Sequence, residues 1–202
     1  MDLLIVAVLG YLIGSVPFAY IIGKVFFGTD VREYGSGNLG GSNTGRVLGK
    51  KAGVAVMTLD LLKVTLSAFL AWKISSHAWA MACGAVSAAI GHCYPLYVRF
   101  RGGKAVAALY GYLFALWVLA DYSPLVFFLP LIAFCVILAA FKIVSLSSIL
   151  SSLVALAYAC AIEAHISVVC TVVFFAILII LRHSGNIRRM LSGTERKIRW
   201  LK

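Results

Sequence analysis

The sequence predicts an all-α fold, namely a polytopic bundle of about seven membrane-spanning helices. Of its 202 residues, 62% are hydrophobic and only 12% are charged, which is about half the charged share of an ordinary soluble domain. The mean hydropathy is +1.00. This composition excludes a soluble fold with a large core. The length suits one compact bundle, so we expect a single integral membrane domain over residues 1–202.

Seven apolar segments are candidates for the spanning helices, each of which needs roughly 20 mostly apolar residues. They cover residues 3–24, 53–72, 78–98, 105–120, 124–141, 147–163 and 165–182. The first segment has neither a basic leader nor an Ala-x-Ala cleavage site, so we expect it to be a retained helix. The last two are separated only by the neighbourhood of Glu163 and His165. Pro17, Pro95 and Pro130 are expected to kink or end helices.

Charge placement orients the predicted bundle. Seven spans put the termini on opposite faces. With the N-terminus outside, nearly all lysines and arginines fall in inside loops and in the C-terminal tail, which includes Arg199 and Lys202. Because basic residues collect in cytoplasmic loops, we expect the N-terminus outside and the C-terminus in the cytoplasm. The net charge of +11 then needs no nucleic-acid partner, since no extended basic face is available.

Three glycine-rich, cationic segments interrupt the apolar pattern, and the predicted topology puts all three on the cytoplasmic side. In the first segment, residues 35–46, five glycines allow positive φ and close backbone approach, and successive N–H groups can form a nest for an anion. Arg46 adds a forked cation, and the neutral donors are Ser36, Asn38, Ser42 and Asn43. The alternative is a flexible connecting loop. A Walker loop is excluded because its Gly-Lys-Ser/Thr ending is absent.

The second segment, residues 101–104, reads Arg-Gly-Gly-Lys directly before a helix expected to begin near Ala105. The backbone donors of Gly102 and Gly103, the positive end of a helix dipole and the Lys104 ammonium would then act together on an anion. The alternative is positive-inside anchoring, which explains the arginines but not the paired glycines. His92 precedes this segment at the end of the third span, where a structural role is favoured over a catalytic one.

The third segment, residues 183–195, closes the last predicted helix and carries His183, Asn186, Arg189 and Glu195. Arginines alone would indicate a tail that binds lipid headgroups. The combination of a histidine, an amide and an arginine at the end of a span instead favours a site for an anionic substrate.

Two ionisable residues lie inside the second predicted span. Asp60 and Lys63 are three residues apart and therefore share one helix face. Since charges inside a membrane are costly and usually paired or functional, we expect an ion pair that braces the site. A proton or ion path is the competing interpretation.

Serines and histidines complete the list of candidate polar groups. Some serines at the start of the sixth span are expected to donate to an anion and others to pack helices; they are Ser145, Ser147, Ser148, Ser151 and Ser152. The four histidines have no ligand-like spacing to one another or to acids, so no metal site is expected.

Taken together, these residues resemble the bacterial membrane glycerol-3-phosphate acyltransferases that use acyl phosphate, the PlsY family. Residues 35–46 match the first family pattern, Gly-Ser-Gly-Asn-x-Gly-Ala-Thr-Asn-x-x-Arg. They read Gly35-Ser36-Gly37-Asn38-Leu39-Gly40-Gly41-Ser42-Asn43-Thr44-Gly45-Arg46. The pattern Lys-Gly-Gly-Lys-Gly-x-Ala-Thr meets Arg101-Gly102-Gly103-Lys104-Ala105-Val106-Ala107-Ala108. The pattern His-x-x-Asn-Ile-x-Arg-Leu-x-x-Gly-x-Glu is matched by His183, Asn186, Ile187, Arg189, Gly193 and Glu195.

The departures from the family pattern concentrate in the second segment. Ala105 stands where the pattern has glycine and adds a Cβ, and Ala108 stands where it has threonine and removes a hydroxyl. The resemblance nevertheless runs along the whole chain, with three motifs in the family order.

The resemblance implies a reaction and a setting. An acyl group passes from acyl phosphate to the 1-hydroxyl of glycerol 3-phosphate, giving lysophosphatidate and inorganic phosphate, the first acylation of phospholipid synthesis. It implies no cofactor, no metal and no coenzyme A. The expected partners are the two substrates and membrane lipid, and a monomer is compatible with this function. The expected location is the bacterial cytoplasmic (inner) membrane, with the site facing the cytoplasm.

The expected site draws on all three segments, because two substrate phosphates repel each other and need several converging cations. The expected catalytic residues are Ser36, Lys104, His183 and Asn186. The residues expected to bind substrate phosphates are Gly37, Asn38, Ser42, Asn43, Arg46, Gly102, Gly103, Ser145, Arg189 and Glu195. The residues expected to support the site are Asp60, Lys63 and His92.

Two questions stay open at the level of sequence. The proton of the attacking hydroxyl passes either to His183 or to a substrate phosphate. An anion transporter and a scaffold protein are the competing classes of function, although seven spans without a detectable repeat are few for alternating access.

Overall fold

The computed structural model describes residues 1–75, 77 and 79–198, and throughout this part of the chain the regular structure is helical. The elements are α1 (Asp2–Gly14), α2 (Phe18–Phe27), η1 (Val31–Glu33), α3 (Gly41–Leu48), α4 (Lys50–Ile74), α5 (Ala80–Cys93), η2 (Leu96–Val98), α6 (Val106–Leu119), α7 (Leu125–Phe141), α8 (Val144–Ala161), α9 (Ile166–Arg182) and α10 (Ser184–Leu191). The all-α prediction is confirmed for these residues. Arg199 and Lys202, which entered the topology prediction, lie outside them.

The predicted spans coincide with helices, but the number of crossings is not settled by helix length. Four stretches are long and apolar enough to cross a membrane, and α9 with α10 makes a fifth if this bent pair counts as one span. The four are Asp2–Phe27, Lys50–Ile74, Ala80–Val98 and Val144–Ala161. α6 and α7 are apolar but shorter. The count of seven spans and the orientation of the termini therefore stay predictions.

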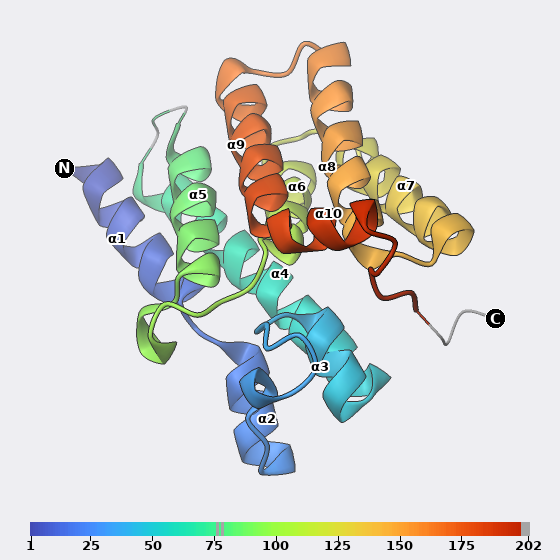
Figure 1. The fold of residues 1–202 in the computed structure, drawn as a ribbon. Helices are drawn as coiled ribbons and strands as arrows, with labels where there is room; N and C mark the ends of the chain where they lie inside the picture. Colours follow the sequence, from blue (N-terminus) through green and yellow to red (C-terminus); the bar gives the residue numbers. More distant parts are fainter. Residues whose placement is uncertain (76, 78, 199–202) are drawn as a thin grey trace. The chain divides into compact units, whose positions relative to one another are not determined.

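The chain forms two compact units, unit 1 from Met1 to Ala115 and unit 2 from Leu116 onward. In unit 1, α1 packs against α5 and α4 (Figure 1). A Cβ at Gly14 would overlap the backbone of Ala88, and one at Gly91 would overlap the carbonyl of Tyr11. Small residues at these contacts allow membrane helices to approach closely.

The first predicted span is broken at Pro17. α1 ends at Gly14 and α2 begins at Phe18, with Pro17 at its N-cap. Proline brings no N–H of its own, and the preceding Val16 carbonyl lies between the two helices, where it accepts a hydrogen bond from Lys63 Nζ at 2.9 Å. The break thus supplies an acceptor for a lysine that is buried in α4.

α3 corrects the expectation that the whole first segment is a loop. The second half of the first segment is helical. Of the five glycines in this segment, only Gly35 and Gly37 have positive φ, at 65° and 69°. The glycines of α3 serve helix packing instead. A Cβ on Gly53 of α4 would lie 2.6 Å from Gly45 Cα and 2.8 Å from Gly41 O. Backbone freedom of the kind an anion nest needs is therefore confined to the part of the segment before α3.

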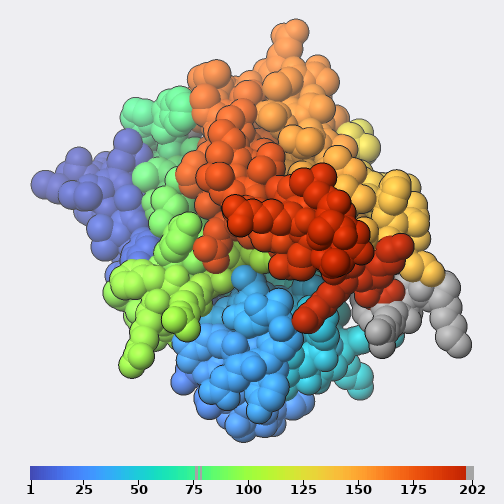
Figure 2. Space-filling view, in the orientation of Figure 1, coloured from blue at the N-terminus to red at the C-terminus, as the bar shows by residue number. Residues whose placement is uncertain are grey.

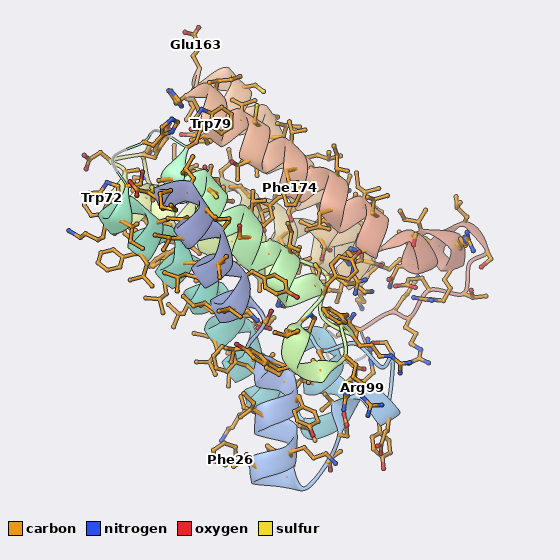
Figure 3. The ribbon with its side chains drawn as sticks, turned by 90° about the vertical axis from the view of Figure 1, so that its left-hand side faces the viewer. Phe26, Trp72, Trp79, Arg99, Glu163 and Phe174 are labelled. Carbon is orange, nitrogen blue, oxygen red and sulfur yellow. The ribbon has the colours of Figure 1, made fainter. Side chains whose placement is uncertain are left out.

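The two ends of unit 1 differ in character. Figure 3 shows Phe26 and Arg99 towards one end of this unit and Trp72 and Trp79 at the other. The first and second segments both lie at the end that carries Arg99. Within unit 1, the glycine-rich segments therefore occupy a common end, as the topology prediction requires.

In unit 2, α8 packs against both α7 and α9 (Figure 1). α10 leaves the end of α9 at an angle of 59°. The third segment, expected to close the last predicted helix, forms a helix of its own over much of its length. The carbonyl of His183 accepts the N–H of Ile187 at 2.8 Å, so a new helical turn starts at the residue where α9 ends.

Candidate functional site

Asn43 organises the loop of the first segment. It is buried, its Oδ1 accepts the Ser36 N–H at 2.8 Å, and its Nδ2 donates to the carbonyls of Val31 at 2.9 Å and Tyr34 at 3.2 Å. Both amide hydrogens are thus used within the loop. Asn43 thus shapes the backbone around Ser36, and its expected contact with a phosphate stays a prediction.

The first and second segments lie side by side in unit 1. Asn38 Nδ2 donates to the Gly102 carbonyl at 3.1 Å, and Arg32 Nη1 reaches the Val98 carbonyl at 3.5 Å. Leu39 and Val98 belong to one buried apolar cluster. In Figure 2 the yellow-green surface of the second segment and the residues before it touches the blue surface of the first. The structure thus joins two segments that are more than 50 residues apart in sequence.

His92 explains the paired glycines of the second segment. The Gly103 N–H donates to the His92 carbonyl at 2.9 Å. A Cβ at Gly102 would overlap that carbonyl and the ring of Pro95, whereas a Cβ at Gly103 would overlap the imidazole of His92. Only glycine avoids both overlaps. Charge anchoring, the alternative considered from sequence, does not account for these contacts.

A cluster of three buried ionisable residues lies behind the second segment. Lys63 Nζ is 2.6 Å from Asp60 Oδ1, and His92 Nδ1 is 3.5 Å from the same oxygen. The three side chains are no more than 5% exposed. The expected pair of Asp60 and Lys63 is present, and His92 joins it. Support of the site by this cluster stays a prediction.

The polar groups best placed for a ligand of unit 1 are at its surface. Ser36, Ser42 and Arg46 are exposed, and Lys104 is half-buried directly before the start of α6. Ser42 and Arg46 are four residues apart on α3 and so share a face. Among the described residues Arg46 enters no ion pair. The N–H groups of Asn43 and Thr44 donate to the Gly40 carbonyl at the N-cap of α3, so the helical hydrogen bonds begin after Gly41 and Ser42. An anion beside Ser42 would meet the N–H groups of these two residues and the Arg46 guanidinium together.

Arg32 has a role that the sequence reasoning missed. Its guanidinium donates to the Asp30 carboxylate from Nε at 3.0 Å and from Nη2 at 2.7 Å, and it lies 4.8 Å from the centroid of the Tyr20 ring. The hydrogen bond from Arg32 holds the pKa of Asp30 below its ordinary value. Asp30 also caps η1 through the Arg32 N–H. The Asp-x-Arg spacing was the available signal, since a short acidic side chain commonly caps a turn two residues on.

In the third segment Glu195 gathers the other polar residues of unit 2. Its Oε1 accepts from Asn186 Nδ2 at 2.6 Å and from Ser145 Oγ at 2.8 Å, and its Oε2 accepts from Arg189 Nε at 2.8 Å. Burial by itself raises the pKa of Glu195, but the hydrogen bonds from Asn186, Ser145 and Arg189 outweigh it and hold the pKa below its ordinary value. An ionised carboxylate repels phosphate, and Glu195 holds three neighbouring donors. Its expected role in binding phosphate stays a prediction that this charge does not favour.

His183 is buried at the start of the third segment, at 4% exposure. Its Nδ1 is 2.8 Å from the Ile179 carbonyl. A carbonyl only accepts, so Nδ1 carries a hydrogen and donates it to Ile179. This arrangement orients the ring from within α9.

The serine cluster of α8 mostly satisfies its own helix. Four hydroxyls donate to carbonyls three or four residues earlier, and they belong to Ser147, Ser148, Ser151 and Ser152. Of the five serines, Ser145 is the one whose hydroxyl bonds to the third segment. The expectation that some of these serines donate to an anion and that others pack helices stays a prediction.

The described residues contain no group of three or more His, Cys, Asp or Glu side chains able to hold a metal ion. The cations that the motifs place near the candidate site are Arg46 and Lys104 in unit 1 and Arg189, which pairs with Glu195, in unit 2. That the reaction needs no metal or cofactor stays a prediction.

Comparisons with known proteins agree with the motifs. A family model described as glycerol-3-phosphate acyltransferase matches residues 4–193 and so runs through both units. A glycerol-3-phosphate acyltransferase of Geobacillus kaustophilus is 46% identical over 97% of this chain and 96% of its own. One from Listeria monocytogenes is 42% identical over 99% of this chain and 98% of its own.

The fold is also similar to solved structures. Crystal structures of PlsY, an integral membrane glycerol 3-phosphate acyltransferase, match with 34% identity and a TM-score of 0.90 in the glycerol 3-phosphate form, and with 33% identity and a TM-score of 0.87 in the lysphosphatidic acid form. Each match covers 98% of this chain and 96% of the other.

Ala105 generates a stability prediction. It is fully buried with a left-handed φ of 61°, a conformation that glycine adopts more readily. We expect Ala105→Gly to raise the free energy of unfolding by up to about 1 kcal/mol, because the left-handed penalty is removed. The measurement is thermal unfolding in detergent, with Ala107→Gly in α6 as the control that should destabilise. A lower melting temperature for Ala105→Gly would contradict the strain.

Glu195 generates a pH prediction. Because its folded pKa is lowered, the carboxylate adds stability above its unfolded pKa of about 4.3, and that stability is lost as pH falls from there towards the folded pKa. Glu195→Gln should therefore lower the melting temperature by a constant amount above about pH 5, with the gap to wild type closing below about pH 4. The exposed Glu163→Gln is the control. A gap that does not depend on pH would show that the ionised form is not stabilised.

Proposed function

The chain belongs to the glycerol-3-phosphate acyltransferase family, whose members place an acyl group on glycerol 3-phosphate in phospholipid synthesis, and we propose that its acyl donor is an acyl phosphate. The glycerol 1-hydroxyl oxygen bonds to the acyl carbon, the bond from that carbon to the phosphate oxygen breaks, and the hydroxyl proton is transferred away. The products are 1-acyl-glycerol 3-phosphate and inorganic phosphate. The glycerol 3-phosphate and lysphosphatidic acid forms of the solved relative support this acceptor and this product.

The observation that carries the proposal is the junction of the first and second segments through Asn38 and Gly102. It holds the loop with Ser36 beside the loop with Lys104, and α3 presents Ser42 and Arg46 at the surface of the same unit. Two cations with neutral donors suit a phosphate, which prefers forked and charge-assisted hydrogen bonds. Unit 1 therefore offers the groups that a phosphate-bearing substrate requires.

An acyl phosphate needs little help from a nucleophilic side chain. It is a mixed anhydride with phosphate as a good leaving group, so the main tasks are orientation of the substrates and stabilisation of charge at the carbonyl. We assign stabilisation of charge at the carbonyl to the donors around Ser36, and the binding of a substrate phosphate to Lys104. This assignment uses cations and hydroxyls rather than a covalent intermediate on the enzyme.

The third segment contributes an amide and a cation whose directions are set by Glu195. We assign Asn186 to orienting the glycerol hydroxyl and Arg189 to a substrate phosphate. One carboxylate already holds both side chains, at 2.6 Å and 2.8 Å. Substrate binding therefore does not have to immobilise either of them, which lowers the entropic cost of binding. Ser145 has the same supporting partner and completes this arrangement. The site is assigned to the cytoplasmic face of the membrane, where positively charged loops collect.

A substrate phosphate, rather than His183, is our assignment for the proton acceptor. His183 is buried and its Nδ1–H is held by the Ile179 carbonyl, which supports an orienting role. His183→Ala should then keep turnover within about tenfold of wild type, since a general base normally contributes 100-fold or more. The measurement is kcat of a folded variant over a range of pH. A loss of more than about 100-fold, with an unchanged melting temperature, would assign the proton to the histidine.

The donor is tested with purified protein supplied with glycerol 3-phosphate and either acyl phosphate or acyl-coenzyme A. We expect lysophosphatidate and inorganic phosphate from the first donor and no product from the second. Arg46→Gln and Lys104→Gln should each lower kcat/KM by roughly 100- to 1,000-fold, because each removes a cation assigned to a substrate phosphate in the transition state. Lys51→Gln removes an exposed charge at the start of α4 and is the matched control.

Two results would refute this proposal. One is product formation from acyl-coenzyme A as efficient as that from acyl phosphate. The other is wild-type turnover by a folded Arg46→Gln variant.

A further inference from the structure

His92 connects the buried charges of unit 1 to the glycine pair of the second segment. Its ring has Nδ1 3.5 Å from Asp60 Oδ1 on one side. On the other side, the ring occupies the space that a side chain at position 103 would need. The residue is 5% exposed. A single imidazole therefore contacts both a membrane-embedded carboxylate and the backbone next to Lys104.

The carboxylate end of this connection is fixed by several elements. Asp60 and Lys63 belong to α4, His92 belongs to α5, and Lys63 Nζ also donates to the Val16 carbonyl at the break between α1 and α2. Removing Asp60 or Lys63 would leave the charge of the other buried without its counterpart, which is strongly unfavourable. The orientation of the His92 ring is thus set by a cluster that has little freedom to move.

The loop end is fixed by the backbone. The Gly103 N–H donates to the His92 carbonyl at 2.9 Å, and the Gly102 carbonyl accepts from Asn38 at 3.1 Å. Two consecutive glycines would otherwise make this loop the most freely moving part of the site. Lys104 follows directly, so the position of its backbone depends on these contacts.

We propose that His92 is a positioning residue for Lys104, which it holds in place by packing its ring, oriented by Asp60 and Lys63, against Gly103. The inference rests on the proposed function only in taking Lys104 to bind a substrate phosphate. A cation on a mobile loop would have to be ordered on binding, whereas a cation on a held loop is already in place. The effect of His92 should therefore appear in substrate binding more than in the chemical step.

The kinetic test compares two replacements of similar size. His92→Leu keeps volume but loses the donor to Asp60, whereas His92→Asn keeps a donor near the Nδ1 position. We expect His92→Leu to raise KM for at least one phosphate substrate about tenfold with kcat within about threefold of wild type, and His92→Asn to recover part of that loss. Separate KM values for glycerol 3-phosphate and acyl phosphate identify the substrate that Lys104 binds. Unchanged KM values for both substrates would overturn the proposal, whatever happens to kcat.

A second test needs no enzymatic activity. Gly103→Ala should lower the melting temperature, because the new Cβ overlaps the His92 ring, and adding His92→Ala should relieve that overlap. Gly102→Ala is the matched control, since its Cβ overlaps the His92 carbonyl and Pro95, which His92→Ala leaves in place. Relief at Gly103 but not at Gly102 supports the packing. Equal relief at both positions, or at neither, contradicts it.

A result that refutes acyl phosphate as the donor can be told apart from a result that refutes the positioning role of His92. If the wild type does not use acyl phosphate, the thermal shift produced by glycerol 3-phosphate is compared between wild type and His92→Leu. A smaller shift in the variant supports the positioning role, and an equal shift overturns it.

Discussion

A carboxylate inside a membrane helix has to be compensated where it lies, and this requirement ties together much of unit 1. Lys63 compensates the charge of Asp60 at 2.6 Å, and His92 lies near the same carboxylate. Lys63 also donates a hydrogen bond to the Val16 carbonyl at the Pro17 break. The break in the first span, the face of α4 and the end of α5 therefore meet at one point. In a medium without water, solvent cannot replace the contacts of such a cluster. The cluster therefore stays in one arrangement and restrains the loops beside it.

The glycines of this chain illustrate two different physical uses of the same residue. Gly35 and Gly37 supply left-handed backbone in a loop. Gly53, Gly102 and Gly103 are required because another group occupies the place of a side chain. In sequence both uses appear as glycine-rich motifs, and the anion-nest interpretation treated them alike. Ala105 adds a third case, since it adopts a left-handed φ although it is not glycine.

An anion site also needs groups that are not cations. Glu195 places a negative charge in the third segment, and its hydrogen bonds to Asn186, Arg189 and Ser145 fix the directions of three donors. Asn43 has the corresponding role in the first segment, where its amide holds the backbone around Ser36. Both residues were predicted from sequence to bind phosphate. In each case the polar atoms are engaged with the protein, an arrangement that orients the neighbouring groups.

The sequence by itself determined the helical class, the approximate position of each apolar helix and the three motifs, because apolar run length and motif spacing are local properties of the chain. It also indicated the pairing of Asp60 with Lys63, since three residues along a helix bring two side chains to one face. It did not reveal the helix within the first segment, the contact of Asn38 with Gly102 or the place of His92 between Asp60 and Gly103. The last two features depend on elements that approach each other across 64 residues, from Asn38 to Gly102, and across 32 residues, from Asp60 to His92. Only the tertiary structure decides such distances, because they follow from the packing of many small contacts at once and not from the preference of any one segment.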